Sequence, residues 1–185
     1  LLRITRTHDI IRRYFVVNGF DGALTMLGLI IGFLVSGATG LSVIINVCLG
    51  AAIALGVSGV SSAYVSEVAE RKRALGKLEE AMSSDLQESV HGEAARWMPL
   101  LIALVNGSAP LIISLLILTP LWLSNAGVFL PVSPLYAAIM IALSLVFMLG
   151  VFLGRIAGVS LLRSGIQTLL VAVLTAALIY LFTGH

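Results

Sequence analysis

The chain has 185 residues, of which 59% are hydrophobic and 11% are charged, and its mean hydropathy is +1.08. A soluble domain of this length needs more polar residues to cover its surface, so the composition excludes that class and indicates an integral membrane protein. The net charge of +2 does not argue for nucleic-acid binding, because the basic residues lie at the ends of apolar runs.

Five apolar segments are long enough to cross a bilayer as helices, which takes about 20 residues each. They cover residues 14–36, 42–66, 98–122, 134–154 and 165–183. The sequence SGATG predicts a tight turn between the first two, and Pro131 and Pro134 delimit the connection between the third and fourth. The predicted fold class is therefore all-α, with five transmembrane helices.

The 11 lysine and arginine residues predict the orientation of these helices. They lie before the first span, between the second and third, and between the fourth and fifth, and the other two loops carry none. Since basic loops stay in the cytoplasm, we expect the amino terminus inside and the carboxyl terminus outside. We also expect a multi-pass protein of the cell membrane in a prokaryote, or of a vacuolar or other organelle membrane in a eukaryote.

The chain divides into three parts. Residues 1–66 hold the N-terminal segment and helices 1 and 2, residues 67–96 form a cytoplasmic acidic helical segment, and residues 97–185 hold helices 3 to 5. Apolar residues at helical spacing predict that the second helix continues into the cytoplasm; they are Val68, Leu75, Leu78 and Met82. Ser84 and Gln87 read as a capping box that starts a second short helix at Asp85, and Pro99 then falls in the first turn of the third span.

Seven of the nine acidic residues lie between Glu67 and Glu93. Among them Asp85, Glu88 and His91 follow each other at helical spacing, so their side chains can converge on one ion. Oxygen and imidazole ligands suit Fe(II), Mn(II) or Zn(II). The alternative is a solvated helix face whose charges pair with neighbouring arginines.

Asp21, in the stretch NGFDG, is the only acidic residue within any predicted span. An ionised carboxylate at this depth costs several kcal/mol unless it is paired, hydrated or bound to a metal. Gly19 and Gly22 let the backbone or an ion come close and allow local unwinding, and Asn18 can add an amide oxygen on the same face. The alternative is an aspartate that bonds a neighbouring helix for structural reasons.

Two further residues are candidates for the same pathway. Met26 can offer a soft sulfur ligand in the first span, although a packing methionine is the alternative. Asn106 interrupts the apolar third span and can line the pathway, although hydrogen bonding between helices explains it equally well.

Several stretches together resemble one family, the vacuolar iron transporters and their prokaryotic relatives. These are NGFDGALTMLGLIIGFLVSG in the first span, GVSSAYVSEVAERKRA after the second, PLLIALVNGSAPLIISLLILTP in the third, and LGVFLGRIAGVSLLRSGIQTLLVAVLTAALIYL across the last two. The resemblance spans nearly the whole chain, and the chain is similar to a prokaryotic-type member.

The resemblance implies a homodimer that moves Fe(II), and also Mn(II), out of the cytosol in exchange for protons, with the path between the two protomers. The metal is the transported ion, and no permanently bound cofactor is implied. The family's first-span aspartate matches Asp21, and its glutamates after the second span match Glu67 and Glu70. The acids of the shorter loop carry over as a group: Glu79, Glu80, Asp85 and Glu88.

The second span departs from the better-known plant-type members, because it contains neither a methionine nor an acid. This departure leaves open the alternative that the chain is a membrane protein that senses cytosolic metal without transporting it. An intramembrane enzyme is disfavoured, because the spans hold no histidine, no lysine and no acid besides Asp21, so an acid–base pair is hard to assemble.

Overall fold

The structure is a computed structural model that describes residues 2–38, 40–82 and 90–183. In this part of the chain all the regular structure is helical: α1 (Leu2–Val35), α2 (Leu41–Met82), α3 (Val90–Asn125), α4 (Pro134–Ala157) and α5 (Leu161–Thr183). Each of these five helices is long and apolar enough to cross a membrane. The prediction of an all-α protein with five candidate membrane spans is therefore confirmed.

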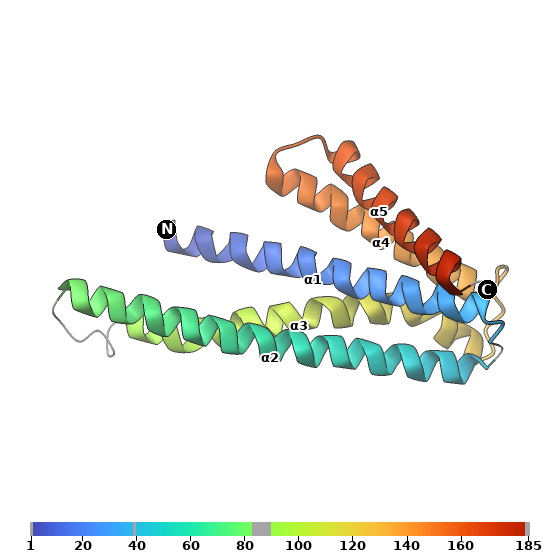
Figure 1. Ribbon diagram of the computed structural model, residues 1–185, viewed down its shortest axis with the longest axis horizontal. Coiled ribbons are helices and arrows are strands. Elements are labelled where there is room, and N and C mark those ends of the chain that lie inside the picture. The colour runs from blue at the N-terminus through green and yellow to red at the C-terminus, as the bar shows by residue number, and fades with distance from the viewer. Residues whose placement is uncertain (1, 39, 83–89, 184–185) are drawn as a thin grey trace.

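The helices form a three-helix unit with a helical hairpin on one side. Figure 1 shows α1, α2 and α3 running side by side along the long axis, while α4 and α5 form a hairpin that leans away from α1 at one end. The beginning of α1 and the end of α5 lie toward opposite ends of the molecule. An odd number of spans produces this arrangement, because each crossing reverses the side on which the chain emerges.

The turn between α1 and α2 depends on the backbone conformation of Gly37. Gly37 has a φ of 67°, a left-handed conformation that glycine adopts without steric cost. The Ala38 N–H donates to the carbonyl of Phe33, which closes the end of α1. The predicted tight turn after the first span is confirmed.

The helices approach closely where one of them carries glycine. A methyl group built on Gly22 of α1 would lie 2.7 Å from the carbonyl oxygen of Pro110 in α3, and one on Gly59 of α2 would lie 3.0 Å from the Cα of Gly107. Between α4 and α5, a methyl group on Gly154 would lie 2.7 Å from the Cβ of Ser164. In lipid, small residues hold helices together because they let backbones meet.

The apolar core lies where α1, α2, α3 and α4 meet. Its buried residues include Ile30 of α1, Cys48 of α2, Ile117 of α3 and Ala142 of α4. By contrast, α5 packs mainly against α4 and keeps many large apolar side chains at the surface. Since lipid is as apolar as these side chains, that surface suits a bilayer.

α2 extends well beyond the length that a bilayer requires. Its 42 residues span about 63 Å at about 1.5 Å per residue, roughly twice the thickness of a hydrocarbon core. The prediction that the second helix continues without a break through Leu75 and Leu78 to Met82 is confirmed. The capping box at Ser84 and Gln87 lies outside the described residues.

One expected boundary in α3 is wrong. Pro99 does not lie in the first turn of the helix, because α3 is already helical from Val90 and continues past Pro99, Pro110 and Pro120. Membrane helices tolerate internal prolines when other groups satisfy the freed carbonyls. Pro120 has no N–H to donate to the carbonyl of Leu116, four residues earlier. The hydroxyl of Thr119 donates to this carbonyl instead, at 2.8 Å.

The described basic residues lie in the parts of the helices away from the α1–α2 and α3–α4 connections. Arg12 and Arg13 lie in the first part of α1, Arg71 lies in the part of α2 beyond the core, and Arg155 and Arg163 flank the α4–α5 turn. In Figure 1 the beginning of α1, the end of α2 and the α4–α5 turn all lie away from the α1–α2 and α3–α4 connections, and the α4–α5 turn lies near the middle of the long axis. The positive-inside prediction requires such a distribution, and the side of the membrane that these parts face stays a prediction.

Candidate functional site

A polar stripe follows one face of α1 through its membrane-spanning part. Tyr14, Asn18 and Asp21 lie at positions i, i+4 and i+7, which share a face of an α-helix. The same spacing continues through Thr25 to Gly28. The stripe therefore puts three side chains with polar groups within two turns, in a helix whose other faces are mainly apolar.

α1 stays helical through NGFDG, so the expected local unwinding does not occur. The two glycines have another use. Gly19 faces Leu149 of α4, where an added methyl group would lie 3.3 Å from Leu149 Cδ1, and Gly22 lies against the backbone of Pro110. The glycines allow α1 to approach α3 and α4, and they do not release backbone carbonyls around Asp21.

Asp21 is exposed on the surface of the single chain. It forms no hydrogen bond or ion pair with any residue of the described part of the chain. This arrangement does not match the structural alternative, in which the carboxylate bonds a neighbouring helix. Because Asp21 lies in a membrane-spanning helix, a carboxylate here needs a proton, water, a cation or a second protein surface.

Asn18 and Asn106 bond the three long helices together. Asn18 Nδ2 donates to Asn106 Oδ1 in α3 and, at 2.8 Å, to the backbone carbonyl of Tyr14. Asn106 Nδ2 donates at 2.8 Å to the carbonyl of Gly59 in α2. The side chain of Asn106 is buried and uses both ends of its amide in bonds between helices, which favours the structural interpretation of this residue.

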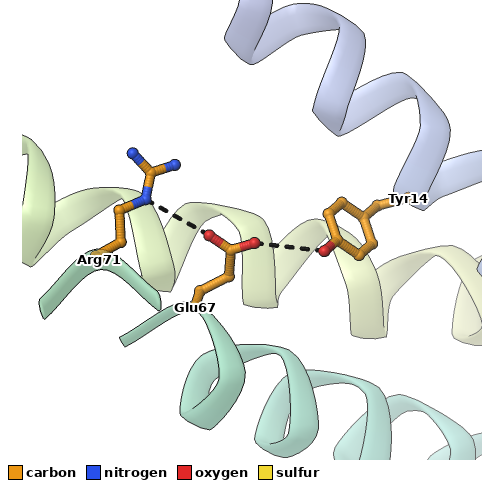
Figure 2. Close-up of polar contacts among 3 residues, drawn as sticks. All are labelled: Tyr14, Glu67 and Arg71. Carbon is orange, nitrogen blue, oxygen red and sulfur yellow. Dashed lines mark hydrogen bonds and ion pairs between the residues drawn. The ribbon is translucent and has the colours of Figure 1, made fainter. Parts of the chain in front are cut away.

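A second polar contact joins α1 to α2 nearer the cytoplasmic end predicted for the bundle. The Tyr14 hydroxyl donates to Glu67 Oε1 at 3.3 Å, and Arg71 Nε lies 3.5 Å from Glu67 Oε2. Figure 2 shows the carboxylate between the phenol and the guanidinium, with one oxygen toward each. The guanidinium of Arg13 lies 6.0 Å from the centroid of the Tyr14 ring.

Asp21 and Glu67 lie at different depths. Tyr14, which bonds Glu67, precedes Asp21 by seven residues, a rise of about 10 Å along α1. The structure therefore does not bring these two predicted metal-binding residues together at one point. Glu67 contacts this face of α1 at Tyr14, and Asp21 lies on the same face two turns further along the helix.

The cytoplasmic acids show no assembled centre in the described residues. Glu70 and Glu80 are exposed on α2 and Glu79 is half-buried, and the described chain holds no cluster of three or more potential ligands. Asp85 and Glu88 lie outside the described residues. The backbone of His91 belongs to α3, while its side chain is not among those described.

Met26 does not lie on the polar stripe. Five residues after Asp21, it points about 140° away around the helix, and its side chain is fully buried among the apolar residues of the core. This position favours the packing interpretation over a sulfur ligand on the face of Asp21.

Sequence reasoning missed Tyr14 as a site residue, because a tyrosine near the end of a span is typical of a membrane-interface anchor. The signal that points to it is its spacing from Asn18 and Asp21. The contact with Glu67 joins residues 53 positions apart and depends on how α1 and α2 lie in space.

No family model matches the chain. It is similar to the uncharacterized protein MJ0645 of Methanocaldococcus jannaschii, with 33% identity over 172 residues that cover 91% of this chain and 86% of the archaeal protein. The similarity therefore includes all the main parts of the bundle. The chain belongs to the same protein family as this archaeal protein.

Proposed function

We propose that this protein is a proton-coupled exporter of divalent transition metal, Fe(II) and also Mn(II), from the cytosol. The observation that carries the proposal is Asp21, an exposed carboxylate in a membrane-spanning helix without a partner in the described chain. Ionisable groups within membrane spans are costly and mark ion or proton pathways. The resemblance to the vacuolar iron transporters supports the choice of ion.

The proposed pathway runs at a homodimer interface along α1. Val17 and Asp21 are both exposed one turn apart, so a second copy that packs on this face would remove the carboxylate from lipid. Two copies of Asp21 would then face the same pathway. Like charges held close do not both ionise readily, so the empty pair retains a proton.

Exchange follows from competition between the proton and the metal. A divalent cation stabilises both carboxylates and displaces the proton, so the two ligands exclude each other at this site. Such mutual exclusion is the physical requirement for antiport. Asn18 adds an amide on the same face, one turn toward the predicted cytoplasmic side.

The acidic part of the α2–α3 extension collects the metal in this proposal. Glu67, Glu70, Glu79 and Glu80 lie along α2, and oxygen ligands of this kind suit Fe(II) and Mn(II). Glu67 contacts α1 through the hydroxyl of Tyr14. We therefore assign the remaining glutamates to capture and Glu67 to the position next to the membrane pathway.

The experiment that tests the proposal is uptake of Fe(II) or Mn(II) into inside-out vesicles that hold the purified protein, with a pH indicator inside. An exporter moves the metal inward and protons outward. A sensor that does not transport would bind metal to the acidic residues and leave both readouts at the level of empty vesicles. Absence of metal uptake by folded protein would overturn the proposal in favour of that alternative.

A further inference from the structure

We propose that Tyr14 and Arg71 form a latch on Glu67, which a divalent cation must displace before this carboxylate can serve as its ligand. The proposal rests on the proposed function, because it concerns a metal ion that moves from the cytoplasmic acids toward Asp21. Tyr14 and Arg71 then act as positioning residues that set the apparent affinity of the pathway for its ion.

Glu67 differs from the other described acids of α2 in its burial. Only 8% of its surface is exposed, whereas Glu70 and Glu80 are classed as exposed. A buried carboxylate is stable only when donors or opposite charges replace its hydration. The hydroxyl of Tyr14 and the guanidinium of Arg71 supply both, one to each carboxylate oxygen.

A metal ion can displace both Tyr14 and Arg71 from the carboxylate of Glu67. At 3.3 Å and 3.5 Å the two contacts are longer than strong charge-assisted bonds, which measure roughly 2.5–2.7 Å from a hydroxyl and roughly 2.7–2.9 Å from a guanidinium. A cation cannot use a carboxylate lone pair that a hydroxyl proton occupies. The positive charge of Arg71 also repels an approaching divalent ion, so each partner competes with the metal for Glu67.

The position of the latch links Glu67 to the turn of α1 that precedes Asp21. Tyr14 also accepts, through its backbone carbonyl, the hydrogen bond from Asn18, which in turn bonds Asn106. Glu67 therefore contacts the membrane pathway at the end of the polar stripe that lies nearest the other acids of α2. A cation that replaces Tyr14 on Glu67 arrives on the face of α1 that carries Asp21.

The test uses Tyr14→Phe and Arg71→Gln, two conservative changes that each remove one competitor. The matched controls are Tyr64→Phe and Arg73→Gln, which make the same chemical changes at exposed positions of α2. The full-length protein is purified for Mn(II) calorimetry and reconstituted for Mn(II) uptake at increasing concentration. We expect the Kd and the apparent KM to fall by about three- to tenfold in both latch variants, with an unchanged maximal rate and unchanged controls.

A Glu67→Gln background separates the latch from a general structural effect. Neither Tyr14→Phe nor Arg71→Gln should alter the KM further there, because the carboxylate for which they compete is gone. If the parent protein transports Mn(II) and the latch variants keep or raise its KM, the latch is overturned and the proposed function stands. If the folded parent neither binds nor transports Mn(II) or Fe(II), the proposed function fails and the latch fails with it.

Discussion

Three polar residues in or near the membrane-spanning part of this protein differ in their bonding partners. Asn106 bonds two other helices through its amide, and Glu67 is held between a phenol and a guanidinium. Asp21 has neither arrangement within the described chain, although it lies deeper along α1 than Tyr14. Of these three residues, Asn106 is committed to bonds between helices, Glu67 is engaged by Tyr14 and Arg71, and Asp21 has no partner among the described residues.

Replacing Asp21 with asparagine should abolish metal-driven proton counterflow. Asp21→Asn keeps the shape of the side chain and removes both the negative charge and the titratable proton. The variant should fold at least as well as the parent, because a costly acid has been removed from the membrane. The measurement is the pH change inside reconstituted vesicles on addition of Fe(II) or Mn(II), normalised to folded protein.

Asp21→Glu is the matched control, since it retains a carboxylate at the same position and should keep part of the counterflow. Counterflow from Asp21→Asn close to that of the parent would show that another group carries the proton. A parallel loss of folded protein and activity would instead assign Asp21 a structural role.

At the scale of the helices, contact between α2 and α3 depends on glycines in both partners. A methyl group on Gly107 would collide with the backbone of α2 at Gly56 and Val60, whereas one on Gly50 meets nothing within 4 Å. Asn106, next to Gly107, reaches the carbonyl of Gly59 only because the two backbones are this close. Helix packing therefore sets the geometry of the polar bonds.

We expect Gly107→Ala to destabilise the protein by about 1–3 kcal/mol, because the added methyl group overpacks the contact between α2 and α3. Gly50→Ala in the same membrane region should leave the stability unchanged or slightly higher, since alanine is the better helix former and has space. Unfolding of both variants in detergent measures the difference. Equal stabilities would show that α2 and α3 do not pack as closely as described.

In the proposed function, the acidic residues of the α2 extension capture metal, and the fold does not require their charges. Replacing Glu79, Glu80, Asp85 and Glu88 together with their amides should weaken Mn(II) and Fe(II) binding by about tenfold or more while the helical content stays the same. Calorimetry on the purified variant gives the affinity, and circular dichroism checks the fold. Unchanged Mn(II) and Fe(II) binding would show that these acids form a charged surface and do not bind the metal.

At the scale of the whole molecule, the five helices and the distribution of basic residues lead to one topology. The α3–α4 connection and the α4–α5 turn lie at opposite ends of α4, as Figure 1 shows. If the basic parts of the helices face the cytoplasm, the region of Asn125 faces the outside.

Cysteine labelling tests this topology. A cysteine introduced between Arg71 and Arg96 should react only with reagents that reach the cytoplasm, and one at Asn125 should react from outside. The native Cys48 is buried and should stay unreactive, which the parent protein checks. Labelling of both introduced cysteines from the same side would contradict the five-span topology.

Much of the fold could be predicted from the sequence, because each membrane span is a local property. Twenty apolar residues in a row form a helix in lipid wherever their neighbours lie, since the backbone must satisfy its own hydrogen bonds there. The continuation of α2 to Met82 and the turn at Gly37 are local in the same sense. The start of α3 was less predictable, because Pro99 resembles a helix beginning and tertiary packing allows it inside the helix.

The sequence by itself determined that this protein is helical and suited to a membrane, and it identified Asp21 as the one acid within a span. Only the tertiary structure decided which polar residues are engaged. It paired Tyr14 with Glu67, committed Asn106 to Gly59 and Asn18, and buried Met26 away from the polar stripe. The physical reason is that spacing along a chain sets the face of one helix, whereas contacts across 47 to 88 residues depend on how glycine-rich helices pack against each other.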